Sequence, residues 1–174
     1  MLRRLFVIAA TVPILLAVAW WNRRRGASWE ETGARCLLVG SVLLIVCVTL
    51  FPFPVAARWW KPWHFRHAQL VPLHTIRDQL SEGGLQAAQV FGNVLVFAPF
   101  GFALPLVWER ARRAPVTIAA GALLSLAVEL TQLFVPTHTT DIDDLLLNTL
   151  GAALGFAAAA VVLRARTRDR APVA

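Results

Sequence analysis

The sequence predicts an all-α protein, a polytopic bundle of about five transmembrane helices. Composition is the first observation behind this prediction, because 57% of the 174 residues are hydrophobic and only 16% are charged. Soluble domains carry about 25% charged residues, and the mean hydropathy here is +0.61. The second observation is that several apolar runs reach about 20 residues, the length that a helix needs to cross a bilayer. We therefore treat residues 1–174 as a single membrane domain.

The spans are placed by the length of each apolar run, because an unpaired backbone is untenable in lipid. The predicted spans are Leu5–Trp21, Ala34–Phe53, Ala87–Trp108, Pro115–Val135 and Asp144–Leu163. The first run follows two arginines, as in a signal peptide, but Arg23, Arg24 and Arg25 stand where a cleavage site would be expected, so we expect an uncleaved span. The second run contains Cys36 and Cys47, which lack the spacing of metal ligands and are interpreted as core thiols.

Two longer segments lie outside the predicted spans, the connection 55–86 and the basic segment 164–174. The connection 55–86 is too long for a tight turn, and we expect a partly ordered lid on the outer surface. Its histidines, His64, His67 and His74, lack a strong metal-ligand spacing and are interpreted as surface residues, so no metal site is predicted. The basic segment 164–174 is expected to be a loose cytoplasmic tail that can touch anionic headgroups.

Basic residues predict the orientation. With five spans, alternate connections lie on the same side, and eleven arginines then fall on the side of the C-terminus, against six basic residues on the other side. The positive-inside rule therefore places the C-terminus in the cytoplasm. Nucleic acid is not an expected partner, because the arginines flank apolar spans instead of forming a basic arm.

The fourth and fifth spans carry the polar residues that indicate a site. A charge at the centre of a membrane helix costs about 2.5–3.5 kcal/mol on insertion scales, so it usually faces protein or a wet cavity. Ser125, Glu129 and Gln132 share one helix face, and Asp141, Asp144 and Asn148 repeat a similar spacing. Together with a polar stripe at Gln89 and Asn93, these groups lie toward the predicted outer half of the membrane. The candidate ligand-binding residues are Glu129, Gln132, Asp141, Asp144, Asn148, Asn93 and His138.

Structural explanations compete with this interpretation. Thr140 or Asp141 can cap the fifth helix, with Asp143 and Asp144 in a first turn favoured by the helix dipole. Asp143 points away from this face and is expected to reach solvent. Asn93, Asn148 and Gln132 can serve as hydrogen bonds between helices, and the stretch 151–155, Gly-Ala-Ala-Leu-Gly, is interpreted as a packing face of small residues.

Four short stretches resemble the VanZ-like family of small bacterial membrane proteins. They begin at Gln69 (QLVPLHTI), Asn93 (NVLVFAPFG), Glu129 (ELTQ) and His138 (HTTDIDDLLLNTLG), and they define a core of about residues 69–155. The family pattern usually has Arg where this chain has His138, and Asn where it has Gln69. The resemblance implies a role in the cell envelope, at the bacterial cytoplasmic membrane, and the family's namesake is associated with low-level resistance to the glycopeptide teicoplanin. It implies no settled chemical activity and no cofactor.

Two functions from different classes follow. In the first, the candidate residues line an outward-facing acidic pocket that binds a membrane lipid, a lipid-linked cell-wall precursor or a lipopeptide headgroup, without turnover. In the second, the protein is a membrane hydrolase or transferase in which Glu129 acts as a base and Asp141 and Asp144 hold a divalent cation. A transporter is a third possibility, which the absence of an evident repeat weakens.

Overall fold

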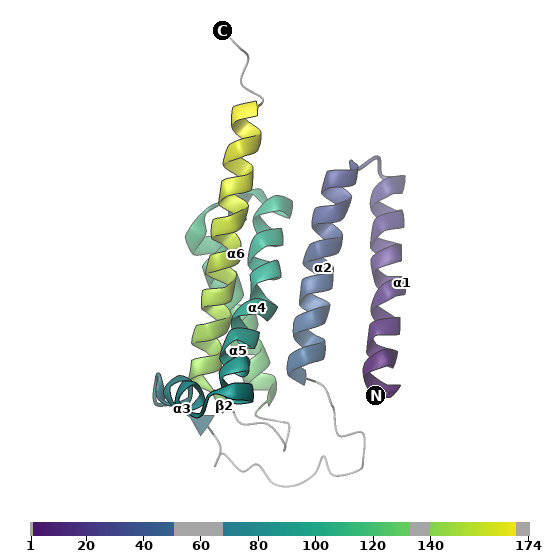
Figure 1. Ribbon diagram of the computed structural model, residues 1–174. Coiled ribbons are helices and arrows are strands. Elements are labelled where there is room, and N and C mark those ends of the chain that lie inside the picture. The colour runs from purple at the N-terminus through teal and green to yellow at the C-terminus, as the bar shows by residue number, and fades with distance from the viewer. Residues whose placement is uncertain (1, 51–67, 133–139, 170–174) are drawn as a thin grey trace.

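The computed structural model describes residues 2–50, 68–132 and 140–169 (Figure 1). The described part of each predicted span is helical: α1 (Leu2–Arg24), α2 (Trp29–Leu50), α4 (Gly84–Val107), α5 (Ala114–Gln132) and α6 (Ile142–Asp169). Within the described part of the chain, α2, α4, α5 and α6 are long and apolar enough to cross a membrane. The first predicted span corresponds to α1, a 23-residue helix that packs beside α2. The all-α prediction is therefore confirmed.

Two helix ends differ from the prediction by five residues or more, for local reasons. Helix α2 begins at Trp29, five residues before the predicted Ala34, because Ser28 and Glu31 form a capping box. The Glu31 amide donates to Ser28 Oγ at 3.2 Å, and the Ser28 amide donates to Glu31 Oε2 at 3.1 Å. Helix α6 continues through residues 164–169, so this part of the predicted loose tail is helical instead.

Short elements close the two ends of the bundle. The 3₁₀ helix η2 (Glu109–Arg112) connects α4 to α5. At the opposite end, helix α3 (His74–Glu82) lies across the bundle (Figure 1). Two short parallel strands, β1 (Ala68–Gln69) and β2 (Thr140–Asp141), place Gln69 opposite Asp141. The predicted lid thus contains a helix and a strand, and the remainder of that prediction, residues 55–67, lies outside the described residues.

Glycines allow α4 and α6 to approach closely. A Cβ on Gly151 would lie 2.2 Å from the Val94 carbonyl oxygen, and a Cβ on Gly155 would lie 2.0 Å from that of Ala98. The small residues at 151–155 therefore form a packing face, as interpreted from the sequence. Phe97 of α4 is completely buried beside this contact layer, in a core shared with α2 and α5.

Candidate functional site

Hydrogen bonds to Glu129 connect the end of α5 to the residues that precede α6. Its side chain is only 4% exposed, and its Oε2 atom accepts a hydrogen bond of 3.0 Å from the backbone amide of Asp141. The Thr140 hydroxyl donates to the Glu129 carbonyl oxygen at 3.2 Å. Glu129 thus faces protein, which is the arrangement that a carboxylate within an apolar helix requires.

Asp141 caps helix α6. Its Oδ1 atom accepts a hydrogen bond of 2.9 Å from the amide of Asp143, the second residue of the helix. The capping interpretation of Asp141 is therefore correct. The cap does not use the whole carboxylate, since Asp141 also lines the pocket described below.

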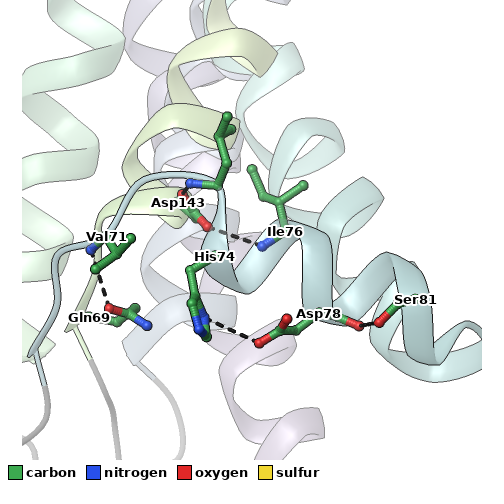
Figure 2. A network of polar contacts seen from close by, with 8 residues as sticks. Gln69, Val71, His74, Ile76, Asp78, Ser81 and Asp143 are labelled. Atoms are coloured by element: carbon green, nitrogen blue, oxygen red, sulfur yellow. Dashed lines mark hydrogen bonds and ion pairs between the residues drawn. The ribbon is translucent and has the colours of Figure 1, made fainter.

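Asp143 is where the sequence-based expectation was wrong. Instead of reaching solvent it is completely buried, and its two carboxylate oxygens accept hydrogen bonds from the amides of Leu73 (2.6 Å) and Ile76 (3.0 Å) (Figure 2). These amides belong to the N-cap and the first turn of α3. Asp143 therefore caps a helix that lies some seventy residues away in the sequence, and it ties α3 to α6.

Asp144 and Asn148 make contacts between helices at successive turns of α6. Asp144 Oδ1 accepts a hydrogen bond of 2.5 Å from Asn93 Nδ2 on α4. One turn further along α6, Asn148 Nδ2 donates to Ser125 Oγ on α5 at 3.0 Å. Asn93 and Asn148 therefore both make the bonds between helices that the structural explanation predicted, Asn93 to α6 and Asn148 to α5.

Two candidate residues remain, Gln132 and His138. Gln132 turns toward α2, where its Nε2 atom donates to the Thr49 carbonyl oxygen at 3.0 Å. Its Oε1 atom is buried and has no hydrogen-bond partner among the residues that the structure describes. His138 lies outside the described residues.

A pocket of about 470 Å³ opens beside Asp141 and Asp144. Helix α3 supplies most of its wall, and β1 supplies Gln69. The lining residues are Gln69, His74, Thr75, Asp78, Gln79, Glu82, Asp141 and Asp144. Figure 2 shows His74 directed at Asp78, with 3.2 Å between Nδ1 and Oδ2. The wall thus carries four carboxyl groups, and no lysine or arginine is among these lining residues.

The α3 residues of this pocket were missed from the sequence, although a signal exists. His74, Asp78 and Glu82 recur every four residues, which places them on one face of a helix. We predicted only a partly ordered lid there, because a nine-residue polar segment lacks the length that identified the spans.

The described residues contain no group of three or more side chains suited to holding a metal ion.

The described residues form apolar helices long enough to span a membrane, and buried carboxylates lie near one another at one end of the bundle. This combination is that of a polytopic membrane protein. Residues 38–163, most of the chain, match the model of a family described as VanZ/LLP1. The chain therefore belongs to the VanZ-like family, as the motifs suggested, and the match includes all the pocket residues. No curated protein and no solved structure matches the chain.

Proposed function

We propose that this VanZ-like membrane protein binds the amine-bearing headgroup of a lipid-linked or lipopeptide molecule in the pocket between α3 and α6. The supporting observation is the charge of the wall, which carries four carboxyl groups and, among the residues that the structure describes, no lysine or arginine. Asp141 and Asp144 each use Oδ1 in a structural hydrogen bond. Among the described residues, no hydrogen bond engages the Oδ2 atom of either side chain, so these oxygens are available to accept bonds from a ligand.

The pocket would face the outside of the cell. Figure 1 supports this orientation, because the α1–α2 turn, the α4–α5 connection and the end of α6 lie together at the end of the bundle opposite α3. These segments carry arginines, and Arg166 of α6 lies 3.3 Å from Glu30 of α2. By the positive-inside rule this basic end, with the C-terminus, is cytoplasmic. The protein would then act at the bacterial cytoplasmic membrane on an envelope molecule, consistent with the resistance to teicoplanin-type glycopeptides associated with the family's namesake.

Binding is tested with the full chain in nanodiscs and a lipopeptide that carries one free amine, compared with its N-acetylated form. We expect saturable binding of the amine form that weakens as salt is added. Exposed charge pairs contribute about 0.2–1 kcal/mol each, so Asp78→Asn combined with Glu82→Gln should weaken binding several-fold. The matched control is Glu109→Gln, which removes an exposed carboxylate from η2 at the other end of the bundle. Equal affinity for the acetylated form would contradict the proposal.

The same preparations separate binding from catalysis. Glu129 is not among the pocket residues, and its Oε2 atom is already engaged by the Asp141 amide. We therefore expect no turnover of lipid-linked cell-wall precursors, with or without a chelator. Chelator-sensitive turnover that disappears in Glu129→Gln would favour the hydrolase or transferase hypothesis instead.

A further inference from the structure

Helix α3 has two unlike sides. The side toward the acidic pocket carries His74, Asp78 and Glu82. By helical geometry Leu80 lies on the opposite side, and it is 50% exposed. Leu73, the N-cap residue of α3, is 61% exposed. Helix α3 contains no buried residue. It is therefore an amphipathic helix whose apolar side is uncovered by the described part of the chain.

The apolar side continues into the segment that precedes α3. Leu70 and Val71 are also exposed. Val71, Leu73 and Leu80 border a second hollow of about 790 Å³. The lining residues of this hollow are Val71, Pro72, Leu73, His74, Ile76, Arg77, Asp78 and Leu80. We call this surface the apolar edge of α3. Uncovered apolar patches of this kind mark contacts with protein or with membrane.

The position of α3 favours membrane. The amides of Leu73 and Ile76 are bound by Asp143, in the first turn of the apolar helix α6. At its other end, α3 passes directly into the apolar helix α4 through Gly83 and Gly84, both with positive φ, which glycine adopts without strain. Both attachments lie where a spanning helix begins, so α3 is fixed at the depth where hydrocarbon meets headgroups.

The chemistry of the edge also matches lipid. Arg77 lies four residues after Leu73 and three before Leu80, so it projects from the same side of the helix. It also lines the apolar hollow. An arginine beside leucines at this depth can reach lipid phosphates while its stem stays among acyl chains. Helix α4, which packs against α3, also carries an exposed apolar side chain, since Phe91 is 62% exposed. Amphipathic helices that lie in the interface plane show this arrangement.

We propose that the apolar edge of α3 lies in the outer boundary of the membrane, with lipid acyl chains against Leu73 and Leu80 and filling the adjacent hollow. Arg77 binds phosphate at the surface, and the acidic side of α3 faces water. The inference concerns how α3 sits in the bilayer, and it does not depend on whether the acidic pocket binds an amine.

Spin labels test this placement. In a chain carrying Cys36→Ser and Cys47→Ser, a nitroxide is attached at Leu80→Cys. The control on the polar side is Glu82→Cys, because Glu82 lines the acidic pocket and not the apolar hollow. The protein is reconstituted in phosphatidylethanolamine–phosphatidylglycerol vesicles. We expect the ratio of collisions with oxygen to collisions with a water-soluble nickel chelate to be several-fold higher at position 80 than at position 82. Equal ratios would mean that α3 lies in water. Weak collisions with both reagents at position 80 would mean that protein covers the edge, and either result overturns the proposal.

A second measurement needs no substitution. The unmodified protein is irradiated in vesicles that contain a phospholipid with a diazirine in its acyl chain, and the adducts are mapped by mass spectrometry. We expect adducts in residues 70–80 as well as on the exposed side of α4 around Phe91. Labelling of α4 without labelling of 70–80 would overturn the proposal even if the cysteine variants did not fold.

Discussion

The buried carboxylate of Asp143 holds α3 against the bundle, so Asp143→Ala should release this helix. Both of its oxygens accept backbone hydrogen bonds from the start of α3. A hydrogen bond to a charged group contributes about 1.5–3 kcal/mol, and the lower value suits amides that are only partly buried. Losing both bonds therefore costs about 3 kcal/mol, or a shift of about 150-fold in the docking equilibrium at 1.4 kcal/mol per factor of ten.

Hydrogen–deuterium exchange measures this shift. Helix α3 has nine residues, and isolated helices shorter than about 12–15 residues are marginal in water. Once undocked, α3 should unfold, and its amides from Arg77 to Glu82 should exchange about 100-fold faster in nanodiscs. The amides of α5 should keep the protection of the original protein, since none of the hydrogen bonds described for α5 involves Asp143.

The control is Asp78→Ala, which also removes a carboxylate near α3. The His74 and Asp78 side chains are 52% and 59% exposed, and exposed ion pairs contribute about 0–1 kcal/mol. We therefore expect at most a severalfold change. The reasoning is refuted if Asp143→Ala leaves α3 exchange unchanged while α6 remains folded, or if both variants accelerate exchange equally.

Two further predictions concern packing between the spans. Gly155→Val should destabilise the bundle by about 3 kcal/mol or more, at the upper end for overpacking, because its Cβ would meet the Ala98 carbonyl oxygen. Thermal unfolding in detergent should show a lower Tm, whereas Gly92→Ala, with open space around its Cβ, should leave the Tm unchanged or raise it. Asn148→Ala removes the bond to Ser125 and should cost about 0.6 kcal/mol, the average for such bonds in membranes. Amine binding should be unaffected by Asn148→Ala, and a lost binding signal would show that the site extends deeper than the pocket.

The long helices were predictable because a single physical quantity, the length of an apolar run, identifies a membrane span. Their ends were less predictable, because local polar contacts set them. The capping box of Ser28 and Glu31 is visible in the sequence and begins α2 in a segment with two glutamates, before the apolar run. At the C-terminal end of α6, arginines continue the helix because they have good helix propensity and suit the negative end of its dipole.

Helix periodicity predicted which side chains share a face but not which helix each one contacts. Ser125, Glu129 and Gln132 do lie on one side of α5, and all three are buried. However, Ser125 bonds to α6, Glu129 bonds to the strand before α6, and Gln132 bonds to α2. A single helix face can meet two neighbours, and the order of helices around α5 is a tertiary property that spacing does not reveal.

Helix α3 shows a stronger limit of local reasoning. Its N-cap residue is Leu73, a poor capping residue that also has a positive φ of 66°, so the local sequence contains no start signal. Asp143 supplies the acceptor oxygens for the backbone amides at the start of α3, which a local capping side chain would otherwise supply. Since the cap and the helix are joined only by the folded bundle, a pattern search within one segment can find the helical spacing of His74, Asp78 and Glu82 but finds neither the start of the helix nor the reason for Asp143.

The acidic turn is best understood as three carboxylates with different tasks. Asp143 has a structural role, because both of its carboxylate oxygens accept hydrogen bonds from backbone amides. Asp141 and Asp144 each use one carboxylate oxygen, Oδ1, in a structural hydrogen bond, and both side chains line the pocket. The dipole of α6 lowers the cost of gathering these charges at its N-terminus. His74 and Asp78 of α3 border both the acidic pocket and the apolar hollow. An amphiphile with its chain along the apolar edge could therefore present an amine to the carboxylates, which is how the two proposed surfaces would serve one ligand.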